Sequence, residues 1–440
     1  MMTANNHEDP IVIVGMAVEA PGGVDTLGDY WTALAESHDL IGPFPRDRGW
    51  PVERLMGMAD TDGWGRVADA GGFLTGAAHF DPAFFGLSPR EAVAMDPQHR
   101  VALRVAWRAL ENTGVNPDAL AGAEAGCFMG VSYTEYGPRG DEPNEYTGYR
   151  ATGAALGATA GRISHVLGLV GPSISVDTAC ASSLSALHLA ANAIRADECE
   201  WALAGGVCVM GSAAGFFEFA RANALSPDGQ CKPYSAHAQG TLWGEGAGVV
   251  VLERESRARE LGHRIYGRVL ATRVNHNGKG APIAVPSSAA QERLIRKTIA
   301  AAGIPAEYIG MIEGHGTGTA VGDPIELVAL QNVYGAGAGA GPLLGSVKSN
   351  LGHAQAASGL LGLIKVLLSG LHGRIAPTRF ADEPTMEVDW DAASLRLADR
   401  LSDWAPRDGV RYGAVSSFGV AGTNAHAVIA MPALEEEIHV

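Results

Sequence analysis

The sequence has little positive charge and no long apolar run, and each shortage excludes a class of protein. Lysine and arginine together number 32 against 48 acidic residues, which gives a formal net charge of −16. Because the chain as a whole does not attract a phosphate backbone, we do not expect nucleic-acid binding. The longest apolar stretches, such as residues 360–368, are about half of the ~20 residues that a membrane-spanning helix needs. We therefore expect no transmembrane segment and no membrane partner.

Cysteine is also scarce. The 440 residues include five cysteines, an odd number, and the opening MMTANNHEDP lacks the charged and then apolar pattern of a secretory signal. Free thiols in a reducing, cytoplasmic compartment are therefore expected. The cysteines do not form the closely spaced pairs that bind zinc, so we expect no metal site.

What remains is typical of a large packed enzyme. Hydrophobic residues make up 47% of the chain and charged residues 18%, and 58 glycines indicate many tight turns and close backbone contacts. The length allows two or three domains or one large two-part unit. Repeats, low-complexity tracts and flexible linkers are not evident, so the parts should pack into one body.

Short apolar segments alternate with helical patterns, which predicts an α/β protein. Strands are expected at residues 10–15, 202–210, 246–253 and 311–313. The first of these runs into a glycine turn. An amphipathic helix is expected at residues 97–113, ending at Gly114. The polar segment 254–264 favours a boundary near residue 258, and residues 1–8 should form a short loose arm.

Cys180 is the first candidate for chemistry. It follows a β-like run that ends at Asp177, and it precedes a helical pattern with an apolar stripe. That stripe consists of Leu184, Leu187, Ala191 and Ile194. On such a strand-to-helix turn, the helix dipole and free backbone N–H groups favour a thiolate, so we expect a lowered thiol pKa. The alternative is a buried, inert cysteine, which is our interpretation of the other four.

Two histidines strengthen the case for Cys180. His315, in EGHGTGTAVGDP, and His353, in KSNLGHAQAASG, each follow a short apolar run and lie in a glycine-flanked loop. Catalytic groups often project from such loops at strand ends. After His315, we expect a helix with Asp323 as N-cap, proline at its first position and Glu326 at its third. After His353, GLLGLIKVLL indicates a buried helix.

The chain resembles the type I polyketide β-ketoacyl synthases of the thiolase superfamily in four motifs, which occur in the family's order and spacing. These motifs are DTACASSL, EGHGTGTAVGDPIE, KSNLGHAQAASG and SSFGVAGTNAHA. The stretches DPIVIVGM, FFGLSPREAVAMDPQHR and SPDGQCKPYSAHAQGTLWGEGAGVVVLER also match, so the resemblance covers roughly residues 9–430. It implies a thiolase-like fold of two similar halves in αβαβα layers. Residues 1–258 would carry the nucleophilic cysteine, and residues 259–440 the two histidines.

The resemblance also implies a reaction. Cys180 would accept an acyl group from a carrier's phosphopantetheine thiol as a thioester. A malonyl-type extender on another carrier would then lose carbon dioxide and attack that acyl group, which is a decarboxylative Claisen condensation. His315 and His353 would polarise the extender's carbonyl and assist decarboxylation. Lys348 would set the electrostatics near the histidines; the alternative is a solvated lysine.

The remaining site residues come from the same resemblance. The backbone N–H of Val420, in SSFGVAGTN, would pair with that of Cys180 as an oxyanion hole. Thr317 and Thr319 would bind the pantetheine arm, and Phe418 would line the pocket. Two departures from the family, Ala181 in place of serine and VNHNG in place of a VNQDG-type stretch (residues 274–278), lie where acyl-chain selection can differ.

Partners and pathway are expectations of the same kind. The resemblance implies a homodimer that binds no cofactor itself and works with acyl or peptidyl carrier proteins. Because recognisable acyltransferase, reductase and carrier segments are missing, we expect a chain that is either freestanding or excised from a larger synthase, with carriers that act in trans. An acidic carrier would need a local basic patch. Phrases such as VGMAVEAPGG and PREAVAMDPQ resemble ketosynthases of mycobactin- or nocobactin-type siderophore assembly lines.

Three other functions stay open at the level of sequence. A non-elongating or chain-initiating ketosynthase would decarboxylate without making a β-keto product. A cysteine hydrolase would use Cys180 and one histidine, and a non-catalytic partner subunit would be expected to lack the cysteine. The presence of Cys180, His315 and His353 together favours elongation.

Overall fold

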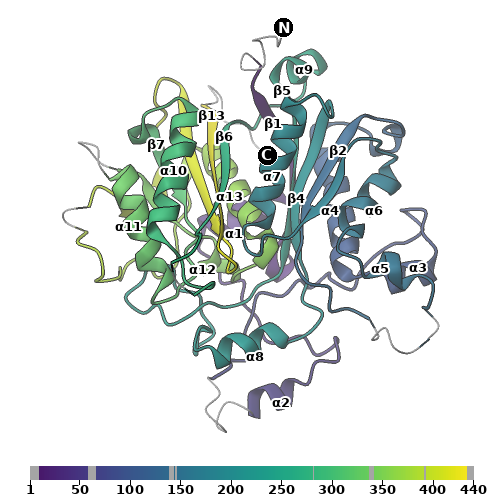
Figure 1. The fold of residues 1–440 in the computed structure, drawn as a ribbon, viewed down its shortest axis with the longest axis horizontal. Helices are drawn as coiled ribbons and strands as arrows, with labels where there is room; N and C mark the ends of the chain where they lie inside the picture. Colours follow the sequence, from purple (N-terminus) through teal and green to yellow (C-terminus); the bar gives the residue numbers. More distant parts are fainter. Residues whose placement is uncertain are drawn as a thin grey trace.

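The structure is a computed structural model that describes residues 9–57, 66–137, 143, 146–280, 282–335, 341–390 and 393–433. The expected loose arm at residues 1–8 lies outside these residues. Figure 1 shows strands in the middle of the molecule and helices on either side of them.

The central sheet is built from two similar sets of five strands. The first set is β1 (Ile11–Glu19), β2 (Ala125–Gly130), β3 (Ser173–Val176), β4 (Trp201–Cys208) and β5 (Gly246–Arg254). The second is β6 (Gly267–His276), β7 (Ile309–Glu313), β8 (Leu343–Gly345), β12 (Val410–Phe418) and β13 (Thr423–Pro432). The short β10 (Arg396–Leu397) extends the second set, and β9 (Arg374–Ile375) pairs separately with β11 (Ser402–Asp403).

Both sets have the same topology. The strand order is β10-β8-β7-β12-β13-β6-β1-β5-β4-β2-β3. Outward from the middle, each set has two antiparallel pairings followed by two parallel ones. The sets join where β1 pairs with β6, at Val12 opposite Arg268 and Ile13 opposite Gly267. The expected two similar halves are therefore confirmed, while a domain boundary at residue 258, inside helix α9 (Glu255–Leu261), stays a prediction.

Helices form three layers around the strands, as the αβαβα expectation requires. The outer helices of the first half are α4 (Pro97–Thr113) and α6 (Ala158–Leu167), and those of the second are α10 (Ser288–Ala302) and α11 (Gly322–Tyr334). Helices α7 (Ser182–Arg195) and α13 (Ser358–His372) lie between the two sets of strands. The smaller helices are α1 (Leu27–Ala35), α2 (Val52–Gly57), α3 (Pro89–Ala94), α5 (Arg150–Gly153), α8 (Ala214–Arg221) and α12 (Lys348–Leu351).

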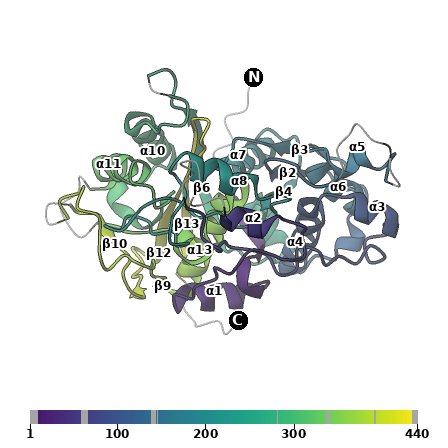
Figure 2. The same ribbon diagram turned by 90° about the horizontal axis from the view of Figure 1, so that it is seen from below.

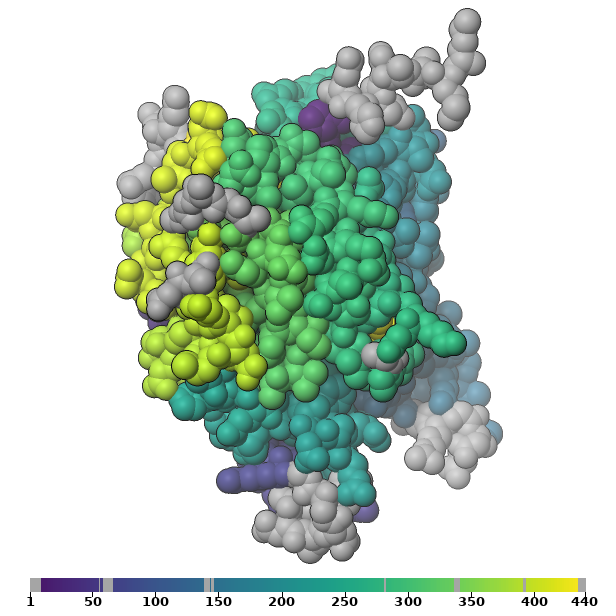
Figure 3. All heavy atoms as spheres, turned by 60° about the vertical axis from the view of Figure 1, so that its left-hand side comes forward, coloured from purple at the N-terminus to yellow at the C-terminus, as the bar shows by residue number. Residues whose placement is uncertain are grey.

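Each helical layer has its own apolar core. The middle core contains Leu187 of α7 and Leu361 of α13, the core of the first half Val105 of α4, and that of the second half Ile295 of α10. The view from below separates the helices of the two halves, with α10 and α11 on one side and α3, α5 and α6 on the other (Figure 2). Figure 3 shows the second half, green to yellow, forming one face of the molecule.

Helix α13 is apolar enough to raise the question of a membrane. By length and composition, residues 355–372 could cross one, but 83% of this segment is buried inside the fold. It packs between the two halves as a core helix, which agrees with the buried helix predicted after His353.

Two local predictions had different outcomes. Helix α4 begins and ends as expected: Asp96 Oδ1 accepts the Gln98 N–H, and Gly114 has a φ of +86°.

The expected glycine turn after residue 15 is wrong, because β1 continues to Glu19. Gly15 instead sits at a register shift in the β1–β5 pairing, and a Cβ there would lie 2.3 Å from Thr113 Cγ2. That glycine therefore allows α4 to pack against the strand.

Candidate active site

Cys180 lies on the predicted strand-to-helix turn, between β3 and α7. The preceding Ala179 has a φ of +53°, a left-handed conformation that is unfavourable for a residue with a side chain. Asp177 stabilises it, because its Oδ1 accepts the Ala179 N–H (N to O, 2.8 Å) and the Ser132 hydroxyl (O to O, 2.7 Å). The turn thus presents Cys180 at the start of α7. Sequence patterns had not identified Asp177 or Ala179 as its supports.

The Cys180 sulfur is buried, and this changes its acidity. Burial raises the thiol pKa to about 11, although Lys348 and the backbone N–H groups of Val420 and Cys180 itself act to lower it. The expectation of a lowered pKa is therefore wrong, because desolvation of the thiolate outweighs these favourable charges and dipoles. Both N–H groups nevertheless lie close enough to the sulfur to act on its pKa. They are the pair that the family resemblance implied as an oxyanion hole.

His315 follows strand β7 and lies beside Phe418. The His315 Nδ1 accepts the Phe418 backbone N–H (N to N, 3.3 Å). Burial lowers the imidazole pKa well below its ordinary value, and Lys348 and His353 lower it further. The ring is therefore neutral near pH 7, with its proton on Nε2.

His353 is arranged in the same way. Its Nδ1 accepts the Gln355 backbone N–H (N to N, 3.2 Å), and its Nε2 is buried without a partner among the described residues. Burial, followed by Lys348, lowers its pKa well below the ordinary value. The ring centroids of His315 and His353 are 5.4 Å apart. The site thus contains two neutral imidazoles, each of which has an Nε2–H group to donate.

Lys348 begins helix α12 and is 2% exposed, so the alternative of a solvated lysine is wrong. Burial lowers its pKa, while Glu313 and Glu326 act in the opposite direction. The positive charge of Lys348 nevertheless acts on the site, because it lowers the pKa of Cys180 and of both histidines.

Two buried carboxylates hold the His315 loop. Glu326 accepts the N–H groups of His315 (N to O, 2.7 Å) and Gly316 (2.8 Å) and the hydroxyl of Tyr234 (O to O, 3.0 Å). Asp323 does not cap α11 as predicted, because that helix begins at Gly322 and the carboxylate turns back to accept the N–H groups of Tyr234 and Gly318. Burial raises the pKa of Asp323 to about 7. The GDPIE motif therefore positions the loop, a role that its helix-start pattern did not show.

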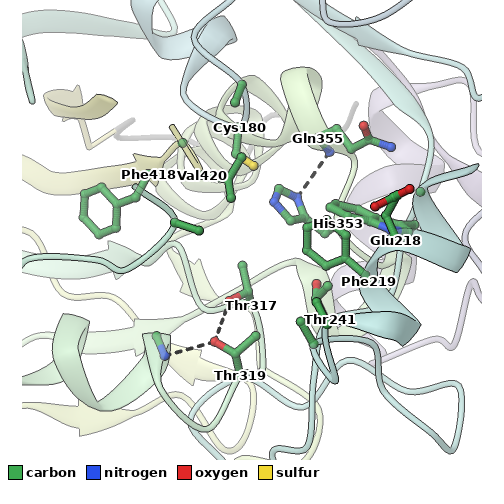
Figure 4. A pocket seen from close by; sticks show the side chains of 18 of the residues that line it. Cys180, Glu218, Phe219, Thr241, Thr317, Thr319, His353, Gln355, Phe418 and Val420 are labelled. Carbon is green, nitrogen blue, oxygen red and sulfur yellow. Dashed lines mark hydrogen bonds between the residues drawn. The ribbon is translucent and has the colours of Figure 1, made fainter. Parts of the chain in front are cut away.

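The predicted residues come together around one cavity of about 850 Å³, lined by Cys180, His315, His353, Thr317, Thr319, Phe418 and Val420. Figure 4 shows the sulfur of Cys180 facing the ring of His353, with Val420 beside the cysteine. The Thr317 and Thr319 hydroxyls are 3.3 Å apart on the opposite wall, and Thr319 Oγ1 also accepts the Gly322 N–H (N to O, 3.1 Å).

All five cysteines are unpaired and buried. Within the described part of the chain, clusters of three or more histidine, cysteine, aspartate or glutamate side chains suited to a metal ion are absent. The cavity itself brings a thiol, two imidazoles and a backbone N–H donor together.

The comparisons with known proteins agree with this geometry. The chain matches the β-ketoacyl synthase N-terminal domain over residues 8–258 and the β-ketoacyl synthase C-terminal domain over residues 266–381. It is 47% identical over 425 residues to the spectinabilin polyketide synthase system protein NorA' of Streptomyces orinoci and 46% identical over 427 residues to the mycoketide-CoA synthase of Mycobacterium tuberculosis. Each match covers 96% of this chain but only 11% and 10% of those much longer proteins.

Solved structures show the same likeness. The oxazolomycin ketosynthase domain OzmH KS7 of Streptomyces albus superposes with a TM-score of 0.88 at 38% identity, over 96% of this chain and 74% of that one. The ketosynthase from module 6 of the bacillaene synthase of Bacillus subtilis gives 0.87 at 37% identity, over 96% and 72%. Sequence, fold and site geometry therefore agree: the chain belongs to the β-ketoacyl synthase family, among the ketosynthases of type I polyketide synthases, which are condensing acyltransferases.

Proposed function

We propose that this chain condenses an acyl group on Cys180 with a malonyl-type extender by decarboxylative Claisen condensation in polyketide biosynthesis. The observation that carries the proposal is the arrangement around the sulfur. Two backbone N–H groups converge on it, and two neutral histidines line the same cavity. This set of groups suits two successive reactions at one thiol.

The first reaction loads the enzyme. The Cys180 sulfur attacks the carbonyl carbon of an acyl thioester, and the oxyanion that forms accepts the N–H groups of Val420 and Cys180. When the tetrahedral intermediate collapses, the phosphopantetheine thiol leaves with the proton that Cys180 has lost. The high thiol pKa keeps Cys180 protonated in the resting enzyme, so the two N–H groups and Lys348 contribute most as negative charge develops.

The second reaction forms the carbon–carbon bond. The Nε2–H groups of His315 and His353 donate to the carbonyl oxygen of the extender thioester, which stabilises the enolate formed when the carboxylate leaves as carbon dioxide. The enolate carbon then attacks the acyl carbonyl on Cys180. The cysteine thiolate leaves, and the elongated β-keto chain stays on the carrier.

Other residues support these steps in the proposal. Thr317 and Thr319 bind the pantetheine arm, since their hydroxyls line the cavity wall opposite Cys180. Phe418 lines the pocket and also holds the proton of His315 on Nε2 through its own backbone N–H. Burial lowers the pKa of both histidines and keeps them neutral, and Lys348 adds to this effect because a nearby cation opposes their protonation.

The substrates are proposed to arrive on phosphopantetheine of acyl or peptidyl carrier proteins acting in trans, with no cofactor bound by this chain. We propose a homodimer because β3 is the last strand of the sheet and exposes Ile174 at 42%. A cytoplasmic location is supported by five unpaired thiols. A siderophore pathway rests on sequence phrases alone and stays a proposal, as does the division of the chain at residue 258.

The test is intact-protein mass spectrometry of wild type and Cys180→Ala, first with an acyl thioester and then with a malonyl-loaded carrier. The proposal requires an acyl adduct on wild type only, followed by a β-keto product on the carrier. An adduct with carbon dioxide release but without that product would identify a non-elongating enzyme. Rapid hydrolysis of the adduct would identify a hydrolase, and absence of any adduct would favour a non-catalytic partner subunit.

A further inference from the structure

The oxyanion donor Val420 and the next residue, Ala421, form the exposed tip of a turn whose end residues, Gly419 and Gly422, are buried. Strands β12 and β13 are joined by residues 419–422, in which the Gly422 N–H donates to the Gly419 carbonyl (N to O, 2.8 Å). Val420 is 43% exposed, so its side chain does not anchor the turn. The bond between Gly422 and Gly419 links two peptide groups, because the Gly419 carbonyl shares a peptide with the Val420 N–H and the Gly422 N–H shares one with the Ala421 carbonyl. A contact to the Ala421 carbonyl can therefore act on the Val420 N–H through the turn's own hydrogen bond.

The end of strand β6 makes this contact. His276 is its last residue, and its Nε2 lies 2.9 Å from the carbonyl oxygen of Ala421, the residue after Val420. On the other side of the ring, Nδ1 accepts the Gly278 N–H (N to N, 2.9 Å). Because Nδ1 accepts, the proton of the neutral ring is on Nε2, which donates to Ala421. Both ring nitrogens are thus used, and one of them holds the turn.

Neighbouring contacts fix the position of the His276 imidazole ring against the turn. A Cβ on Gly422 would lie 2.9 Å from His276 Nε2, so the glycine allows the ring to approach the turn. The Asn277 N–H donates to the Gly422 carbonyl (N to O, 2.9 Å), and the Asn424 side chain donates to Asn277 Oδ1 (2.8 Å). These bonds fix where the turn ends, whereas the His276 bond reaches the Ala421 carbonyl, in the peptide whose N–H closes the turn onto Gly419.

We propose that His276 is a positioning residue for the oxyanion hole, acting through the Ala421 carbonyl on the orientation of the Val420 N–H. The inference rests on the proposed oxyanion role of Val420. Removing an oxyanion donor outright typically costs on the order of 10²–10³ in rate. A donor that is present but displaced costs less, so loss of the His276 bond is expected to slow acylation of Cys180 by about 10-fold.

Two substitutions at this one position separate positioning from a general structural role. In His276→Gln, the terminal amide reaches the place of Nε2 and can still donate to Ala421. In His276→Asn, the shorter side chain reaches only the place of Nδ1, so it can accept the Gly278 N–H but cannot reach Ala421. The measurement is the rate at which Cys180 is acylated by an acyl N-acetylcysteamine thioester, followed by intact-protein mass spectrometry over a range of thioester concentrations.

The expected result is a fall of about 10-fold in the maximal acylation rate of His276→Asn with an unchanged half-saturating concentration, and a rate for His276→Gln within about 2-fold of wild type. The inference is overturned if His276→Asn acylates like wild type. It is also overturned if both variants slow equally and lose the same amount of melting temperature, because that pattern indicates a structural role. Failure of the wild type to acylate would instead refute the proposed function, so the two failures are distinguishable.

Discussion

The raised pKa of Cys180 makes a quantitative prediction about its reactivity. Burial raises the pKa of the thiol from 9.0 to about 11. The thiolate fraction at pH 8 therefore falls from roughly one in ten to roughly one in a thousand. A more basic thiolate is also more nucleophilic. For a Brønsted slope of about 0.45, raising the pKa by two units increases the rate constant of the thiolate by a factor of about 8. The net expectation is that Cys180 reacts with a small disulfide about 10-fold more slowly at pH 8 than a thiol of ordinary pKa.

The assay is the reaction of the protein with a dipyridyl disulfide, followed by the absorbance of the released thione, between pH 6 and pH 10.5. Below its pKa the thiol loses its proton as pH rises, so the logarithm of the rate should increase by about one per pH unit without levelling off before about pH 10. Cys180→Ala is the control, because it measures whatever the other four cysteines contribute to the absorbance, and that contribution is subtracted from the wild-type rate.

A second variant tests the cause. Lys348 acts to lower the Cys180 pKa, so Lys348→Met should slow the reaction further at every pH below 10. Restricted access also slows a buried thiol, but it does not change the pH at which the rate levels off. A plateau below pH 9 in the wild type would therefore refute the reasoning, since it would mean that the helix terminus and Lys348 outweigh burial.

Three other substitutions test the supporting structure. Glu326→Gln replaces the carboxylate that accepts the His315 N–H with an amide. It should lower the free energy of unfolding by about 2 kcal/mol and slow carbon dioxide release at least 10-fold. Unchanged release would contradict the proposed role of that loop. Gly130→Ala places a Cβ 2.5 Å from the backbone of α7 and should lower the free energy of unfolding by about 1–3 kcal/mol. An unchanged denaturation midpoint would contradict that close packing. Lys365→Met removes the ion-pair partner of the buried Glu313 carboxylate, whose Oε2 lies 2.8 Å from the lysine Nζ. We expect a loss of about 3–5 kcal/mol in the free energy of unfolding, and a thermal melt like that of wild type would show that the pair contributes little.

Local signals made parts of the fold predictable. Helix α4 was predicted to the residue because Asp96, Pro97 and Gly114 are themselves the start and stop signals. Strand β1 was predicted too short, because Gly15 is typical of a turn in sequence and only its contact with α4 shows why it lies inside a strand. A glycine at a tight crossing and a glycine in a turn have the same local pattern.

The sequence by itself determined the family, the α/β class and the identity of the reactive groups, because Cys180, His315 and His353 lie in motifs that are contiguous along the chain. Only the tertiary structure decided their chemical state. Burial, which raises the pKa of Cys180 and keeps both histidines neutral, depends on everything packed around them. The tautomer of His315 is set by the N–H of Phe418, 103 residues away. Protonation follows from desolvation and from contacts between distant segments, and neither is contained in a local pattern of residues.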